Sequence, residues 1–108
     1  MQIDKQLADM FEKHTLLPAI IQQHDTKEVL MLAYMDREAL KRTLDSGQTW
    51  FYSRSRQSYW HKGETSGNIQ TVRGVYTDCD CDTILVLVDQ TGNACHTGAH
   101  NCFFNKLL

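Results

Sequence analysis

Thr83-Ile84-Leu85-Val86-Leu87-Val88-Asp89-Gln90 is nearly continuous in β-branched residues and leucine. A short apolar run of this kind, bounded by turn residues, predicts a buried β-strand. The residues that follow it, Thr91-Gly92-Asn93, are typical of a turn. We therefore expect a strand in the interior here, with the other elements of the fold arranged around it.

The segments around this strand predict short strands and two short helices. Apolar or aromatic runs between turn residues indicate the strands, and apolar residues at helical spacing indicate the first helix. Asp36 is a suitable N-cap for the second helix and Gly47 a suitable C-cap. The predicted strands are Leu16–Gln23, Glu28–Met35, Thr49–Ser53, Ser58–His61 and Ile69–Tyr76, and the predicted helices are Met1–His14 and Arg37–Asp45. We therefore predict an α+β fold, a small and mostly antiparallel β domain with two short helices.

Length and composition predict one globular domain. The chain has 108 residues, and we expect a single domain over residues 1–108. The hydrophobic share of 42% is typical of a globular protein. A net charge of -2 does not provide the basic field that a nucleic-acid backbone requires, so no nucleic-acid partner is expected. No apolar run suits a signal peptide or a membrane span, which predicts a cytoplasmic protein without a membrane partner.

Asp78-Cys79-Asp80-Cys81-Asp82 is the most unusual segment of the chain. If it is extended, Asp78, Asp80 and Asp82 project from one face, with neighbouring Cα atoms roughly 6.5–7 Å apart. Three like charges on one face repel one another unless a cation lies between them. Carboxylate oxygens are hard ligands, so magnesium is the metal that we expect here. A solvated acidic turn ahead of the buried strand is the alternative.

The same alternation would place Cys79 and Cys81 on the opposite face of the segment. A metal bound by these sulfur atoms would then differ from the ion bound by the aspartates. An extended segment therefore predicts two separate metal sites, back to back.

The four cysteines indicate metal binding or catalysis, because cytoplasmic proteins seldom contain structural disulfides. Cys95 and Cys102 flank small polar residues and a glycine, which is typical of an accessible, shaped site. Thiolates prefer zinc to magnesium. Three thiolates and an open position make a catalytic zinc site, whereas a fourth protein ligand makes a structural one. The candidates for that fourth ligand are Cys81, His96, His100 and a thiol from another chain.

Trp60-His61-Lys62-Gly63-Glu64-Thr65-Ser66-Gly67-Asn68 is dense in groups that bind anions. Glycines expose backbone N–H groups, and hydroxyl groups and a lysine add further donors. The glycine spacing is not that of a Walker A loop. The functional interpretation is a site for phosphate or ribose, and an ordinary polar hairpin loop is the alternative. The residues expected to contact the substrate are Trp60, His61, Lys62, Thr65, Ser66 and Gly67.

His96 is the best candidate among the histidines for acid–base catalysis, because it follows a candidate zinc ligand. His14 and His24 fall near predicted element ends or turns, where solvated side chains are expected. For His100 we favour a role at the surface or behind the metal ligands.

Three segments together resemble the phosphoribosyl-AMP cyclohydrolase family of histidine biosynthesis. They are Trp60–Asn68, Asp78–Asp82, and Ala94–Gly98 with Cys102-Phe103. They occur in the family's order and at its spacing, and the resemblance extends from about Leu17 to Phe104. The combination is highly specific, whereas each segment alone is only suggestive.

This resemblance implies an enzyme with a nucleotide substrate. The family hydrolyses the N1–C6 bond of the adenine ring in 1-(5-phosphoribosyl)-AMP and opens the purine to a formimino-carboxamide ribotide, using a water molecule activated by zinc. The resemblance also implies an intertwined homodimer in the cytoplasm, with one zinc ion and one magnesium ion per subunit.

Carried over by position, Cys79, Cys95 and Cys102 correspond to the zinc ligands. The resemblance implies that Cys79 comes from one subunit and the other two cysteines from its partner. The three aspartates, Asp78, Asp80 and Asp82, correspond to magnesium ligands, which agrees with the opposite-face argument.

Some features lie outside the family pattern. Cys81 is an additional thiol that we expect to be dispensable, and Asn93 stands where many relatives have proline. Some relatives are fused to a pyrophosphohydrolase domain, which we do not expect here. The alternative function is a non-enzymatic structural zinc module. A thiol redox protein using Cys79 and Cys81 is disfavoured, because their spacing and the absence of a βαβ pattern do not fit one.

Overall fold

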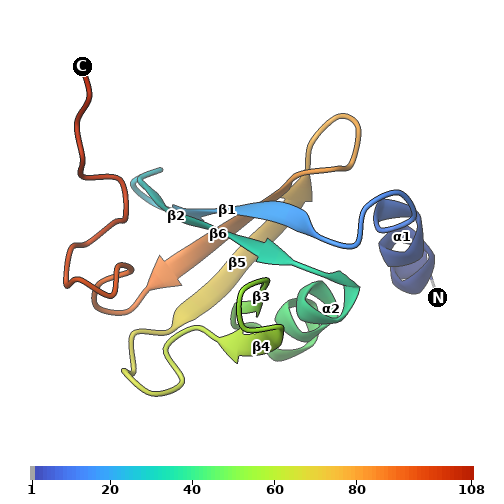
Figure 1. Cartoon of the computed structure of the whole chain (residues 1–108), viewed down its shortest axis with the longest axis horizontal. Coiled ribbons are helices and arrows are strands. Elements are labelled where there is room, and N and C mark those ends of the chain that lie inside the picture. The colour runs from blue at the N-terminus through green and yellow to red at the C-terminus, as the bar shows by residue number, and fades with distance from the viewer. Residues whose placement is uncertain (1) are drawn as a thin grey trace.

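The structure is a computed structural model that describes residues 2–108; Met1, the predicted start of the first helix, lies outside the described residues. It contains two helices and six strands (Figure 1). The helices are α1 (Gln2–Met10) and α2 (Arg37–Ser46), and the strands are β1 (Leu17–Gln23), β2 (Val29–Met35), β3 (Trp50–Ser53), β4 (Ser58–His61), β5 (Gln70–Thr77) and β6 (Ile84–Gln90). The predicted α+β class, with two helices and mostly antiparallel pairing, is confirmed.

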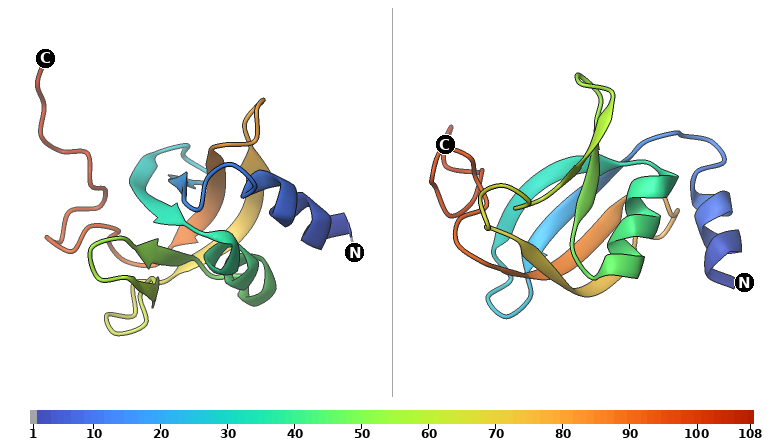
Figure 2. Two further views of the ribbon diagram at one scale, coloured as in Figure 1. Left: turned by 45° about the vertical axis from the view of Figure 1, so that its right-hand side comes forward. Right: turned by 90° about the horizontal axis from the view of Figure 1, so that it is seen from below.

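The main sheet has the strand order β2-β1-β6-β5, and β3 pairs with β4 in a separate two-stranded sheet. β1 pairs antiparallel with β2 and parallel with β6, and β5 pairs antiparallel with β6. Figure 2 shows that α2 and the β3–β4 hairpin lie on the same side of the main sheet. α1 lies beside α2 at one end of the molecule, and residues 91–108 lie at the other end (Figure 1).

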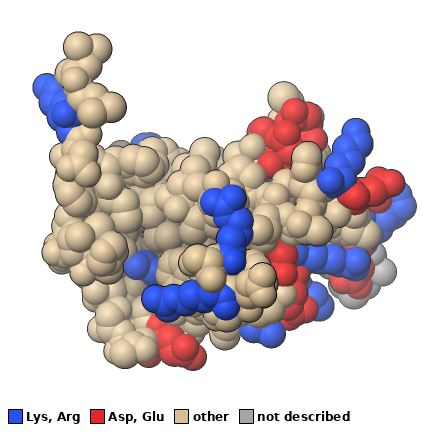
Figure 3. Space-filling view, in the orientation of Figure 1, with Lys and Arg blue, Asp and Glu red and all other residues tan. Residues whose placement is uncertain are grey.

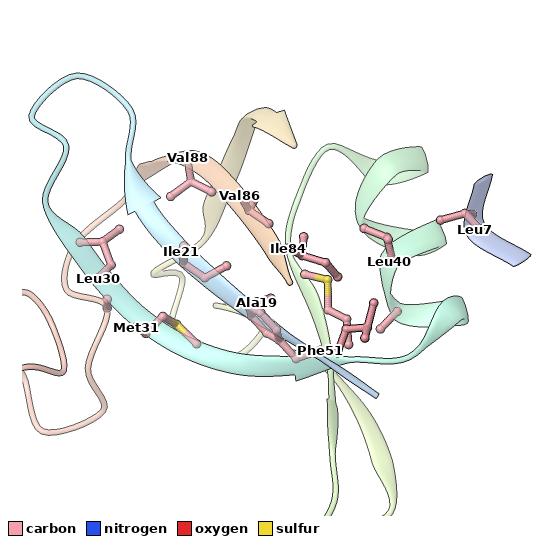
Figure 4. Close-up of a cluster of buried hydrophobic side chains, with 14 residues drawn as sticks. Leu7, Ala19, Ile21, Leu30, Met31, Leu40, Phe51, Ile84, Val86 and Val88 are labelled. Carbon is pink, nitrogen blue, oxygen red and sulfur yellow. The ribbon is translucent and has the colours of Figure 1, made fainter. Parts of the chain in front are cut away.

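One face of the main sheet forms the hydrophobic core. β1 and β6 both alternate buried and half-buried residues, and their buried members include Ile21, Ile84 and Val86. Phe51 of β3 and Leu40 of α2 pack against that face (Figure 4). The prediction of a buried strand therefore holds for one face of β6, whereas the residues of its other face are half-buried. The continuous apolar run supplies a second apolar face, and α2 and the hairpin cover only the first.

The second face of the sheet carries a row of partly exposed apolar side chains. The strand register aligns Leu32, Ile20, Leu85 and Tyr76 across β2, β1, β6 and β5. Leu32 is 45% exposed and Tyr76 57% exposed, and the other two are half-buried. Tyr76, at one end of the row, lines a surface pocket together with Ile3 and Met10 of α1, and no helix of residues 2–108 crosses the rest of the row. An apolar row of this kind is typical of a surface that another protein chain covers.

Helix α2 begins and ends at the predicted caps. The Asp36 carboxylate accepts a hydrogen bond from the Ala39 N–H at 2.8 Å, and Gly47 adopts a left-handed conformation with φ +75°. The second oxygen of Asp36 accepts a hydrogen bond from the Tyr59 hydroxyl. The guanidinium of Arg42 lies 4.5 Å from the centre of the Tyr59 ring. One carboxylate therefore caps α2 and fixes the β3–β4 hairpin against it.

Most element boundaries agree with the prediction to within one residue, and α1 is the main exception. It ends at Met10, whereas the sequence predicts a helix to His14. The Glu12 N–H bonds to the Asp9 carbonyl oxygen, three residues back, which tightens the last turn. The chain then bends towards β1, and Phe11 still packs against the core. None of the helices in the described chain is long and apolar enough to cross a membrane.

Replacing Asp36 with alanine is expected to lower the free energy of unfolding by about 1–2 kcal/mol, because the N-cap of α2 is lost. Urea unfolding followed by circular dichroism measures this change. Asp36→Asn is the matched control, since asparagine caps helices about as well as aspartate. A destabilisation by asparagine equal to that by alanine would show that the capping oxygen is not what matters.

The Asp36→Ala variant has a second expected effect, on the hairpin. Burial and the hydrogen bond to Asp36 raise the pKa of Tyr59 to about 12. Removing the carboxylate should therefore lower the pKa of Tyr59 towards its ordinary value of 10. Ultraviolet titration at alkaline pH, with Tyr59→Phe to identify the signal, measures this shift.

Candidate metal and substrate sites

Cys95 lies in a tight turn after β6. The Gly98 N–H donates to the Cys95 carbonyl oxygen at 3.0 Å, and the Cys95 N–H donates to the Ala99 carbonyl oxygen at 3.2 Å. The Thr97 hydroxyl oxygen lies 3.0 Å from Cys95 Sγ. Sequence reasoning did not identify Thr97 as a partner of the thiol, although its place two residues further along the turn permits the contact. The turn thus holds the Cys95 thiol next to a hydroxyl group.

The Cys102 thiol lies near that of Cys95 and is attached to the edge of the main sheet. The Cys102 N–H donates to the Leu30 carbonyl oxygen of β2 at 2.8 Å. Hydrogen bonding to Thr97 lowers the pKa of Cys95, and Cys102 and the charge of Lys62 act in the same direction. Burial raises the pKa of Cys102, and so does the neighbouring Cys95. Two adjacent thiols, one of them more easily ionised, fit a soft divalent cation such as zinc.

The loop after β4 lies beside this cysteine pair. The Lys62 ammonium donates a hydrogen bond to the Ala94 carbonyl oxygen, next to Cys95. At the other end of the loop, the Thr91 N–H donates to the Ile69 carbonyl oxygen at 2.9 Å. The fold therefore brings together two of the three segments that the sequence singles out, residues 60–68 and residues 94–102.

Glycine is required at the start of this loop. Gly63 has φ +82°, and a Cβ atom there would lie 2.4 Å from the Ile69 backbone nitrogen. The Gly67 N–H closes the loop by donating to the Gly63 carbonyl oxygen at 2.8 Å. The side chains of Thr65 and Ser66 are exposed. The compact backbone thus presents two hydroxyl groups to solvent, near Lys62.

Trp60 and His61 have different surroundings on β4. The Trp60 ring packs on Phe51 with a centroid separation of 4.8 Å, and the tryptophan also lines a surface cavity. The His61 ring stacks on Trp50, and His61 Nε2 lies 2.6 Å from Gln48 Oε1. One nitrogen of His61 is therefore already engaged within the protein.

The two histidines near Cys95 also differ. His96 is exposed at the turn, directly after Cys95. His100 Nδ1 lies 2.9 Å from a carboxylate oxygen of Glu28, whose other oxygen accepts a hydrogen bond from Asn101. These contacts, led by the one from Asn101, lower the pKa of Glu28. His100 thus anchors the C-terminal segment to the start of β2, while His96 remains exposed to solvent.

The aspartate segment is a turn, so the extended conformation assumed from the sequence is wrong. β5 pairs antiparallel with β6, with Thr77 opposite Ile84, so the residues between them must reverse the chain direction. The Cys81 N–H donates to the Asp78 carbonyl oxygen at 3.1 Å, and Cys81 has φ +60°. The argument from alternating faces therefore does not apply to this segment.

The turn nevertheless gathers the three carboxylates. One oxygen each from Asp78, Asp80 and Asp82 lie within 4.8 Å of one another. A hydrogen bond that protonated Asp80 can donate to Asp82 raises the pKa of Asp80, and desolvation and the charges of Asp78 and Asp82 add to the rise. Desolvation by neighbouring groups acts against ionisation of Asp78, but hydrogen bonds from the N–H groups of Asp82 and Thr83 outweigh it and lower the pKa of Asp78. These hard, crowded oxygen ligands fit magnesium.

The third segment lies far from the other two. Cys79 is in the turn that precedes β6, and Cys95 and Cys102 follow that strand. β6 has seven residues, and a strand of that length spans roughly 20 Å. Figure 1 shows the β5–β6 turn and the C-terminal segment at opposite ends of β6. Within residues 2–108, the three aspartates form the only group of three His, Cys, Asp or Glu residues whose ligand atoms all lie within 4.8 Å of one another. A single chain thus places two of the three predicted zinc ligands together.

Comparison with known proteins identifies the family. The model of the phosphoribosyl-AMP cyclohydrolase family matches residues 31–104. A phosphoribosyl-AMP cyclohydrolase of Clavibacter michiganensis is 63% identical over 93 residues, which cover 86% of this chain and 70% of that protein. One from Bacillus cereus is 59% identical, over 86% of this chain and 92% of its own length.

A relative of a second kind is longer. The histidine biosynthesis bifunctional protein HisIE of Lactococcus lactis is 53% identical over 98 residues, which cover 91% of this chain. The chain spans 46% of the length of that bifunctional protein. With the family match and the identity to full-length cyclohydrolases, these comparisons show that the chain belongs to the phosphoribosyl-AMP cyclohydrolase family.

Proposed function

We propose that this chain opens the adenine ring of 1-(5-phosphoribosyl)-AMP by hydrolysis, as a step of histidine biosynthesis. The observation that carries the proposal is the convergence of residues 60–68 with Cys95 and Cys102 in a chain of this family. A donor-rich loop beside a pair of thiols suits a phosphorylated substrate that reacts next to a metal ion.

In this reaction the oxygen of water forms a bond to C6, and the N1–C6 bond breaks. N1 takes up a proton, and the expelled nitrogen stays attached to the product. Zinc, when bound by the cysteines, would lower the pKa of a water molecule towards about 7 and so supply the nucleophile. His96, exposed beside Cys95, is our candidate for moving the proton between water and N1.

We propose that the substrate lies along the loop after β4. The ammonium group of Lys62 and the exposed hydroxyl groups of Thr65 and Ser66 are donors for a phosphate or ribose. The N–H of Gly67 is already used within the loop, so this residue acts by shaping the backbone. Trp60 and His61 flank the loop, and Trp60 retains a face on the neighbouring cavity.

We further propose that a second copy of the chain completes the zinc site. Cys95 and Cys102 lack a third ligand within the described chain, and Cys79 lies at the other end of β6. The apolar row on the open sheet face supplies a surface for the second copy. A two-fold axis along that row, perpendicular to the strands, would bring Cys79 of each copy towards the cysteine pair of the other.

The acidic turn is proposed to bind one magnesium ion per subunit, through Asp78, Asp80 and Asp82. A divalent cation would offset the repulsion that raises the pKa of Asp80. The cytoplasmic location expected from the sequence stays a prediction.

Purified protein is expected to open the ring of 1-(5-phosphoribosyl)-AMP, as followed by ultraviolet absorbance. A zinc chelator should abolish turnover, and added zinc should restore it. Cys95→Ala should lose both zinc and activity, whereas Cys81→Ser should keep both, because Cys81 is not assigned to the site. A folded, zinc-loaded protein without turnover would instead support the structural zinc module.

Two inactive variants are expected to complement one another. Cys79→Ala and Cys95→Ala each destroy every site of their own dimer, but a mixed dimer retains one complete site. Refolding an equal mixture should restore roughly a quarter of wild-type activity, because half of the dimers are mixed and each has one of two sites. Cys95→Ala mixed with Cys102→Ala is the control. In that mixture every subunit lacks one of the two cysteines that a single chain contributes to the site, so no dimer has a complete site and no activity should return.

Asp80→Ala is expected to weaken activation by magnesium at least about tenfold, because one of the three carboxylates is lost. Zinc content, measured by mass spectrometry, should stay at one ion per subunit. Asp45→Ala, a change to an exposed carboxylate on α2, serves as the control and should leave the magnesium dependence unaltered. Loss of zinc from the Asp80 variant would contradict separate roles for the two sets of ligands.

A further inference from the structure

A shallow surface cavity of about 590 Å³, wide open to solvent, lies where the β3–β4 hairpin meets the edge strand β2. Its walls combine aromatic rings, hydroxyl groups and one guanidinium group. The lining residues are Ala33, Tyr34, Tyr52, Ser53, Arg54, Ser55 and Trp60. Of these, only Trp60 belongs to residues 60–68, the segment that the sequence predicts to bind phosphate or ribose. This mixture of apolar walls and a few polar groups is typical of a small-molecule site.

Arg54 is the charged group of this cavity. Its guanidinium lies 4.1 Å from the centre of the Tyr34 ring, which fixes its position from one side. No Asp or Glu of residues 2–108 pairs with it, whereas Arg42 and Arg73 each have a carboxylate partner. Figure 3 shows Lys and Arg side chains over the β3–β4 hairpin. The donors of Arg54 are thus available to an anionic ligand.

Two hydroxyl groups add to the polar side of the cavity. Ser53 Oγ and Ser55 Oγ lie 3.3 Å apart, and Ser53 Oγ also accepts a hydrogen bond from the Arg56 N–H. Both serines line the cavity with Arg54. A guanidinium with hydroxyl groups beside it is suited to a phosphate, which accepts paired hydrogen bonds from arginine.

The cavity is close to the cysteine pair by two routes along the backbone. On β2, Leu30 accepts the hydrogen bond from Cys102, and Ala33 of the cavity lies roughly 10 Å further along the same strand. On β4, Trp60 lines the cavity. Lys62, which follows after His61, donates a hydrogen bond to the Ala94 carbonyl oxygen, next to Cys95. The cavity and the cysteine pair therefore adjoin the same two segments, β2 and the end of β4.

We propose that Arg54, with Ser53 and Ser55, binds the 5′-phosphate of the AMP part of the nucleotide substrate, while Tyr34 and Trp60 form the apolar walls beside it. This inference rests on the proposed function, because it assigns part of that substrate to the cavity. The proposal places one phosphate at Arg54, so the loop at residues 62–68 is left to bind the other end of the substrate. A substrate with two phosphate groups can occupy both places.

The first test measures binding of AMP and of adenosine by calorimetry, without turnover. Arg54→Gln should weaken the binding of AMP at least about tenfold, because a charged hydrogen-bond partner of the phosphate is lost. Binding of adenosine, which lacks the phosphate, should be equal in the variant and the wild type. Arg56→Gln is the matched control, since it removes the same charge from the same turn outside the cavity lining, and it should bind AMP as the wild type does.

Unaltered binding of AMP to Arg54→Gln would overturn the proposal, as would failure of the wild type to bind AMP. Equal losses for AMP and adenosine would also overturn it, because the phosphate would then not be the group recognised. Circular dichroism verifies that each variant is folded. Arg54 is an exposed turn residue with a single ring contact, to Tyr34, so its replacement should lower the unfolding midpoint only slightly.

Turnover gives the second test and separates the two proposals. Arg54→Gln should raise KM for 1-(5-phosphoribosyl)-AMP about tenfold and leave kcat within about twofold, because the phosphate contact is the same before and during ring opening. An unchanged KM would overturn the assignment of Arg54. If the wild type binds AMP through Arg54 but does not open the ring, the phosphate site stands and the proposed reaction fails.

Discussion

The pairing of β6 with β1 on one side and β5 on the other is the constraint on which the rest of the structure depends. It places a long apolar strand inside the sheet, so one face of the strand becomes the core and the other remains partly exposed. It also fixes what happens at the two ends of that strand. The acidic turn must reverse the chain at one end, and the cysteine-bearing turn follows the other.

The β3–β4 hairpin depends on a different set of contacts. Asp36 joins its Tyr59 to the start of α2, and Arg42 lies over the Tyr59 ring. Because the hairpin is fixed at this end, its tip reaches the edge strand, where Arg54 contacts Tyr34. The loop that leaves β4 is in turn held against Ala94 through Lys62. Packing near the core thus determines where the polar groups of both candidate substrate regions lie.

The sequence predicts the elements well because their signals are local. Asp36 and Gly47 mark the ends of α2, and the apolar runs mark the strands to within about a residue. The conformation at Asp78–Asp82 could not be predicted, since alternating residues look the same in a strand and in a turn. Only the antiparallel pairing of β5 with β6 decides between them. The carboxylates still meet, because a tight turn also brings near neighbours together.

The sites depend on contacts that are distant in the sequence, and here local patterns give less. Chemical type and local spacing marked the cysteines and aspartates as metal-binding residues. The contact of Thr97 with Cys95 is local but has no distinctive pattern. The cavity at Arg54 combines β2 with a hairpin tip, and no periodicity connects Tyr34 to that arginine. The separation of Cys79 from Cys95, by contrast, follows from the strand predicted between them, because a seven-residue strand spans roughly 20 Å.

The separation of the thiols along β6 has a thermodynamic consequence. If the zinc site needs two chains, zinc binding and subunit association form one linked equilibrium. Each ion then strengthens the dimer by the same free energy with which the dimer strengthens zinc binding. Dilution of the protein would release metal, and scarcity of zinc would release subunits. The cellular zinc supply would therefore regulate the amount of assembled enzyme, and not only the fraction of sites that are filled.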